Sequence, residues 1–248
     1  MKWRFTIAGG LAGLLVLTAA LAAAQRIETS RVYAEIPGDP LFRVFSTPVP
    51  GSNATLKRDS NGVDVAIDSS QLPEGAYTLW IRVFNRPDLC TGGEGVEGSL
   101  CSRGADIAPS PVPCVPDEQG QSSCSVFWIA SFFVGPDGKT HLSARVNKNE
   151  WRGFVILGAD VAGTAKQALW NLPGAELHFV LRFHGQQALP KGPIFPGDPI
   201  SIEGEADLFR LGRQITRVSG NCEGLPGDLP PETCFDAQLA FFPPSSSR

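Results

Sequence analysis

The sequence predicts an all-β fold: an antiparallel β-sandwich or jelly roll of roughly eight to ten strands, tied by disulfides. Three observations predict it. Within residues 174–185, apolar side chains at 177, 179, 181 and 183 alternate with a second set that is polar except for Val180. Successive side chains on a strand point to opposite faces of the sheet. Shorter strand-forming segments recur between Gly- and Pro-rich turns, without the strand–helix rhythm of a parallel sheet. Six cysteines supply the cross-links.

The first 24 residues have the composition of an export signal. Lys2 and Arg4 form a basic start, residues 7–21 are apolar, and Ala22–Ala24 offer a small-residue cleavage site. The apolar run is shorter than the ~20 residues that a membrane span requires, so we expect cleavage of residues 1–24 and no membrane span afterwards. Residues 25–248 are interpreted as a single β-sandwich domain that lies outside the cytoplasm, extracellular or periplasmic.

The first half of the domain consists of short strand candidates followed by one long one. The short segments are 31–36, 41–45 and 63–67. Residues 76–85 follow a Pro-Glu-Gly turn, and Trp80 lies on their mixed face. The opposite face of this segment is apolar: Tyr77, Leu79, Ile81 and Val83.

Residues at about 87–123 form a long Cys-, Gly- and Pro-rich loop. Its prolines prevent regular strand pairing, and a loop of this length inside a domain is normally functional or tied down. The cysteines favour the second explanation, in which disulfides hold the loop in place. We predict three disulfides, each closing a short local loop: Cys90–Cys101, Cys114–Cys124 and Cys222–Cys234. Zinc is not predicted, because the chain has no tight Cys-x-x-Cys pair.

The second half begins with the best hairpin candidate in the chain. Segment 125–134 is apolar on both faces, as expected of a central strand, and a Gly-Pro-Asp-Gly turn leads from it to the alternating segment 140–146. Residues 162–170 are a candidate short helix. The remaining strand candidates are 154–157, 174–185, 200–202, 214–218 and 234–241.

The polar face of the 174–185 strand carries four candidate ligand-binding residues: Glu176, His178, Arg182 and His184. Arg182 beside His184 could hold an anion, and Glu176 beside His178 could form a carboxylate–imidazole pair. At ~3.3 Å per residue the two histidines lie ~20 Å apart, so they cannot share a metal ion. The simpler interpretation is that these residues make cross-strand hydrogen bonds and salt bridges on a solvated face, where they are dispensable for stability.

Trp80 is the fifth ligand-binding candidate, because an indole can stack on a sugar ring. Burial in a second apolar layer is the alternative interpretation. The chain has neither a Gly-x-Ser-x-Gly nor a His-Glu-x-x-His motif, and no catalytic residue, metal site or cofactor is predicted.

The charge of the chain narrows the choice of partner. It has 21 basic and 25 acidic residues with no basic run, so nucleic acid is not an expected partner. A small molecule, a glycan or a protein remains as the expected partner. We therefore expect an exported, disulfide-stabilised binding or structural domain rather than an enzyme. The alternative is a secreted hydrolase that uses the polar face of the 174–185 strand.

Three pieces of the chain carry a resemblance to a known family: Tyr77–Asn85 with Cys90, Leu169–Gly185, and Ser219–Cys222 with Cys234. They are similar to a family of exported bacterial β-sandwich proteins without an established function. The likeness covers roughly residues 73–241, with the region of Cys114 and Cys124 as an insertion. A weaker likeness, to CHRD-type domains, rests on the two histidines of residues 178–185 and the glycines and prolines that follow. The first resemblance implies an exported β-sandwich, and neither resemblance assigns a catalytic residue.

Overall fold

The computed structural model describes residues 27–35, 45–93, 95–102, 121–149, 155–157, 169–183 and 235–245. These residues form nine strands and one 3-10 helix, η1, and they confirm the predicted all-β antiparallel fold. None of the helical structure in these ranges is long and apolar enough to cross a membrane. The elements are β1 (Ile27–Glu35), β2 (Phe45–Arg58), β3 (Gly62–Ser69), β4 (Gly75–Phe84), η1 (Pro87–Leu89), β5 (Cys124–Val134), β6 (Thr140–Asn147), β7 (Val155–Leu157), β8 (Glu176–Phe183) and β9 (Phe235–Phe242).

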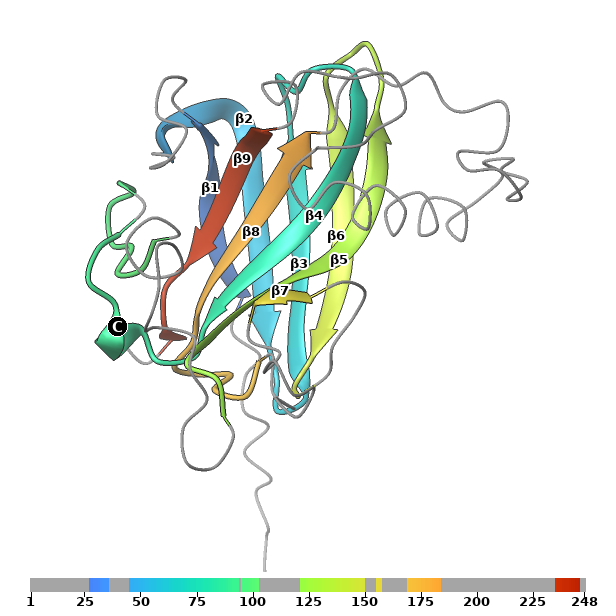
Figure 1. Cartoon of the computed structure of the whole chain (residues 1–248). Coiled ribbons are helices and arrows are strands. Elements are labelled where there is room, and N and C mark those ends of the chain that lie inside the picture. The colour runs from blue at the N-terminus through green and yellow to red at the C-terminus, as the bar shows by residue number, and fades with distance from the viewer. Residues whose placement is uncertain are drawn as a thin grey trace, which may run out of the picture.

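The nine strands form one continuous sheet in the order β6-β3-β2-β1-β9-β8-β4-β5-β7, and every neighbouring pair is antiparallel. The sheet curls over itself, so that β9, β8 and β4 stand in front of β3 and β6 in Figure 1. The concave side of the sheet encloses the main hydrophobic core.

The inner faces of β4 and β8 form the centre of this core, as their alternation predicts. Ile81 lies opposite Phe179 and Leu79 opposite Leu181 in the register of the two strands. Full burial of one such side chain contributes about 1.5–3 kcal/mol. The inner side chains are all at most 7 % exposed: Tyr77, Leu79, Ile81, Val83, Leu177, Phe179, Leu181 and Phe183.

A second apolar cluster lies on the outer face of β9, β8, β4 and β5; we call it the outer cluster. Trp80 belongs to it, is 6 % exposed and donates its indole N–H to Thr78 Oγ1 (2.8 Å). Val96 and Cys101 of the loop after β4 join the cluster, so this loop covers part of the face. The buried members are Phe45, Trp80, Phe84, Val96, Cys101, Cys124, Val126, Trp128, Val180, Leu239 and Phe241.

The predicted hairpin between 125–134 and 140–146 is wrong, although its turn exists. Gly138 donates its N–H to the Gly135 carbonyl (3.0 Å), and the chain reverses there. However, β5 pairs with β4 and β7, whereas β6 pairs with β3. A turn sets a change of direction but not the choice of partner, and β3 offers β6 two carboxylates opposite its own basic side chains, as described below. The chain therefore passes from one half of the curled sheet to the other at this turn.

Strand β2 was missed by sequence analysis, which placed a strand only at 41–45. Pro48, Pro50 and Gly51 lie inside β2, and Gly51 has φ +73°. Proline has no backbone N–H to donate to a neighbouring strand, and glycine within a strand often marks a bulge. The pairing of β1 with β2 is correspondingly irregular, with a shift between Arg31 and Tyr33. The candidate strands at 200–202 and 214–218 lie outside the described residues, and so does the candidate helix at 162–170 except for Leu169 and Trp170.

Candidate functional site

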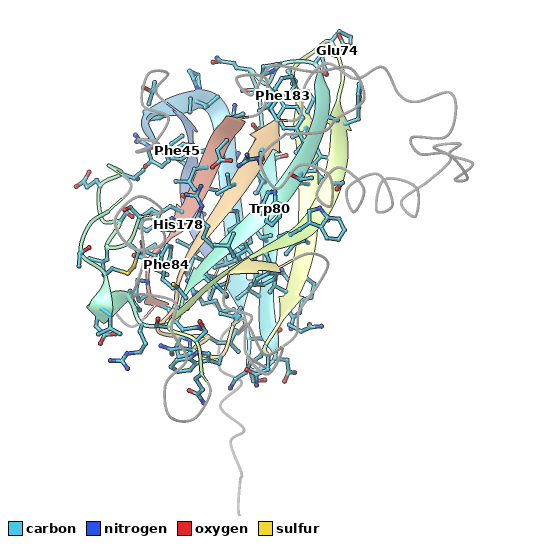
Figure 2. The ribbon with its side chains drawn as sticks, in the orientation of Figure 1. Phe45, Glu74, Trp80, Phe84, His178 and Phe183 are labelled. Carbon is cyan, nitrogen blue, oxygen red and sulfur yellow. A yellow bond between two sulfur atoms is a disulfide. The ribbon has the colours of Figure 1, made fainter. Side chains whose placement is uncertain are left out.

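Two of the polar side chains of β8 are fully buried and the third is partly buried, so the expectation of a solvated face is wrong. Glu176 and His178 are both 0 % exposed, and the Arg182 side chain is 16 % exposed. Figure 2 shows His178 and Phe84 beside the loop that carries the disulfide. Alternation placed these residues correctly on the face opposite the main core, but that face is itself covered. His184 lies outside the described residues.

Glu176 and His178 form the predicted carboxylate–imidazole pair, with 2.7 Å between His178 Nε2 and Glu176 Oε1. The same carboxylate accepts hydrogen bonds from the Ser99 hydroxyl (3.1 Å) and from the backbone N–H groups of Leu100 (3.0 Å) and Cys101 (3.0 Å). A buried charge is tolerated when it is paired and hydrogen-bonded in this way. The pair therefore anchors the loop above it.

Aromatic rings border His178 on both neighbouring strands. Its ring centroid lies 5.0 Å from that of Phe84 on β4 and 5.5 Å from that of Phe241 on β9. The cross-strand partner of His178 on β4 is Arg82. The imidazole thus occupies an aromatic setting inside the outer cluster.

The predicted disulfide Cys90–Cys101 is confirmed, and it closes the loop that Glu176 anchors. Cys101 is 0 % exposed, whereas Cys90 is partly exposed. Cys124 also takes part in a disulfide. Since Cys90 and Cys101 pair with each other, a Cys90–Cys124 cross-link is ruled out. The pairs Cys114–Cys124 and Cys222–Cys234 stay predictions, because Cys114, Cys222 and Cys234 lie outside the described residues.

Arg182, predicted to hold an anion together with His184, pairs with Asp236 of β9. Asp236 Oδ1 accepts from Arg182 (3.1 Å) and Oδ2 accepts from Arg82 of β4 (2.7 Å), so one carboxylate serves two guanidinium groups across three strands. Asp236 is 2 % exposed and Arg82 is 3 % exposed. Sequence analysis missed both. The signal for Arg82 was its place inside an otherwise apolar strand, where a charge needs a partner.

Arg58 is a second buried charge that sequence analysis missed. Its guanidinium donates to Glu28 Oε1 (2.8 Å) and to three backbone carbonyls, those of Leu172 (2.8 Å), Ala175 (3.0 Å) and Pro243 (3.0 Å). The fork of an arginine suits several acceptors at once. Arg58 thereby ties β2 to the chain segments before β8 and after β9.

Asn85 is buried at the end of β4 and connects this strand to two other chain segments by hydrogen bonds. Its side-chain oxygen accepts from the backbone N–H groups of Trp170 (3.1 Å) and Asn171 (3.2 Å), and its amide donates to the Ser122 carbonyl (3.1 Å). Asn171 in turn donates from its amide to the Asn85 carbonyl (2.7 Å). The end of β4 and the chain segment before β8 thus meet here, joined by hydrogen bonds of Asn85 and Asn171.

Exposed polar side chains lie instead on the outer face of β2, β3 and β6, which we call the open face. Cross-strand register arranges its side chains in three rows, and none of them is buried. A recess of about 430 Å³ lies over the first two rows, and another of about 600 Å³ lies at the end of the third. The rows are Lys57–Asp64–Arg145, Thr55–Ala66–Ser143 and Asn53–Asp68–His141.

Ion pairs lie at one end of the open face, and a histidine–aspartate contact lies at the other. Arg145 donates to Asp59 (2.7 and 2.9 Å) and to Asp64 (2.8 Å). The Arg145 guanidinium, together with the Asn61 and Gly62 amides, lowers the pKa of Asp59 to about 2. At the other end, His141 Nδ1 lies 2.7 Å from Asp68 Oδ1.

These arrangements offer no metal centre in the described part of the chain, since no group of three or more His, Cys, Asp or Glu residues there is placed to hold an ion. Comparison with protein-family models, with curated proteins and with solved structures found no match. The geometry therefore defines two regions: a buried polar network under the disulfide loop and an exposed polar face on β2, β3 and β6.

Proposed function

We propose that this chain is an exported, disulfide-stabilised binding domain whose partner binds the open face. The observation that carries the proposal is the contrast between the two polar regions. The acidic and basic groups of β8 and β9 are engaged with one another and buried, whereas the three rows of β2, β3 and β6 present unburied polar and small side chains. Export is supported by the leader-like start of the sequence and by the disulfides, which persist in oxidising compartments.

The shape of the open face favours a protein or glycan surface as the partner. Small-molecule sites are normally clefts that bury most of the ligand and are lined by apolar side chains. The recess over Ala66 and Ser143 is open and is bordered by Lys57, Asp64 and Arg145. Charges of both signs at fixed positions give orientation and specificity to a polar partner surface.

The alternative function, a secreted hydrolase using the polar face of β8, has less support. Its acid–base pair would be Glu176 and His178, and both are fully buried. A general base must come within hydrogen-bond reach of the proton that it abstracts. The alternative therefore requires an opening of the overlying loop.

Residue-resolved lysine acetylation tests the proposal without knowledge of the partner. Purified protein and protein in its native surroundings are treated with the same reagent, and the labelling of Lys57 and Lys139 is measured by peptide mass spectrometry. Both lysines line the recesses, while exposed Lys148 lies in the turn after β6 and serves as the matched control.

We expect Lys57 and Lys139 to label more slowly in the native surroundings, with Lys148 unchanged. Introducing Ser143→Tyr, which fills the recess between the strands, should restore fast labelling of Lys57. If each of the three lysines labels at the same rate in both preparations, the open face is unoccupied and the proposal is refuted.

A further inference from the structure

The loop between Cys90 and Cys101, here called the disulfide loop, is held at two points that lie next to each other. The disulfide joins its ends. Residues 99–101, next to one of these ends, donate three hydrogen bonds to the buried Glu176 carboxylate. The covalent bond and the carboxylate therefore restrain the same short segment.

The same loop forms part of the cover over His178. Val96 (6 % exposed) and Cys101 pack in the outer cluster with Phe84 and Phe241, the two rings that border the imidazole. The outer side of the loop is solvated, since Glu97, Gly98 and Leu100 are exposed. Gly95 and Gly98 have φ +81° and +85°, conformations that glycine adopts without strain. The loop is thus a thin layer between solvent and the Glu176–His178 pair.

We propose that the Cys90–Cys101 disulfide and the Glu176–His178 pair form a redox-responsive latch. With the disulfide formed, residues 99–101 stay on Glu176 and seal the pair. With the disulfide reduced, the segment leaves the carboxylate, and His178 becomes accessible. The latch makes the chemistry of the pair conditional on redox state, and it is independent of any partner on the open face.

The reductant that the latch requires is a dithiol. Cys90 is the more exposed of the two cysteines, so a thiolate attacks its sulfur and releases Cys101 as a thiolate, which takes up a proton. The second thiol of the reductant then breaks the mixed disulfide at Cys90. Cys90 and Cys101 end as thiols, and the reductant ends as a disulfide, having given up two electrons and two protons.

Two sites that restrain one segment are coupled, and the coupling is reciprocal. Loss of the disulfide weakens the hold of Glu176 on the loop, and loss of the Glu176 charge makes the disulfide easier to reduce. Couplings between sites in proteins are typically about 5- to 150-fold, so an effect of at least about fivefold is expected in each direction.

Histidine modification by diethyl pyrocarbonate, mapped by mass spectrometry, measures the first direction. His141, whose side chain is 69 % exposed, is the internal reference. In oxidised protein His178 should react far more slowly than His141. In the double variant C90S/C101S, and in protein treated with dithiothreitol, His178 should react at least about fivefold faster, with His141 unchanged. The double variant isolates this bridge from the one in which Cys124 takes part.

Equilibration with glutathione measures the second direction, using E176Q, which keeps the size of the side chain but removes its charge. The Cys90–Cys101 bridge of E176Q should be reduced at a ratio of reduced to oxidised glutathione at least about fivefold lower than in the parent. An unchanged ratio would overturn the coupling. Protection of His178 in folded C90S/C101S would overturn the latch, and so would loss of the β-sheet circular dichroism of that variant, because the disulfide would then serve the whole fold.

Discussion

Replacing Asp236 with asparagine should destabilise the domain strongly, because this single carboxylate pairs with two arginines in the covered part of the sheet. Arg82 and Arg182 donate to its two oxygens at 2.7 and 3.1 Å, and Asp236 itself is 2 % exposed. Breaking a buried ion pair by removing one partner typically costs about 3–5 kcal/mol, since the other charge is left uncompensated. Typical domains are stable by only about 5–15 kcal/mol.

Urea unfolding followed by tryptophan fluorescence measures this effect. The midpoint for Asp236→Asn should fall while the slope of unfolding free energy against urea stays the same, which is the signature of a pure stability change. The control is Asp64→Asn on the open face, where the carboxylate is 52 % exposed and also pairs with an arginine, Arg145. Exposed pairs contribute about 0–1 kcal/mol. If both variants lose the same small amount, Asp236 is solvated and the buried network does not exist.

Three further variants test other parts of the structure. Arg58→Lys should lose about 2–4 kcal/mol in urea unfolding, because one ammonium cannot serve all the acceptors of the guanidinium, whereas exposed Lys57→Ala should stay within about 0.5 kcal/mol. Asp59→Ala should be less stable than the parent above pH 3.8, and the two melting temperatures should converge as the pH falls through 2, because Arg145 lowers the pKa of Asp59 from 3.8 to about 2 and protonation removes that contribution. A constant difference down to pH 1.5 would contradict the assignment. Phe179→Ala should lose about 3–5 kcal/mol from the main core; a loss under about 1 kcal/mol would place Phe179 outside it.

The inner faces of the sheet could be predicted from the sequence because the relevant information is local. Leu177, Phe179, Leu181 and Phe183 recur at every second position, and period two alone assigns them to one face. The same argument assigned the inner residues of β4. Alternation does not say what covers the opposite face, and for that reason Glu176 was taken for a solvated residue.

Partners that lie far apart in the sequence could not be found by local patterns. Asp236 is 54 residues from Arg182 and 154 residues from Arg82, and nothing in their immediate neighbourhoods links them. The hairpin prediction failed for the same reason. The turn at Gly135–Gly138 is local and real, but the pairing of β6 with β3 joins residues far apart in the sequence, 81 residues for Asp64–Arg145 and 73 for Asp68–His141. The disulfide Cys90–Cys101 was predictable because it closes a short loop.

The position of β9 has a consequence for the order in which the fold can be completed. β9 comes last among the described strands, yet it lies between β1 and β8, the strand that precedes it. A chain that emerges in sequence order has an open gap in its sheet, with two unpaired strand edges, until residues 235–242 arrive. Contacts between distant segments also slow folding. Such a chain stays unfolded for longer, which is compatible with threading through an export channel, but its open edges are exposed to aggregation until β9 inserts.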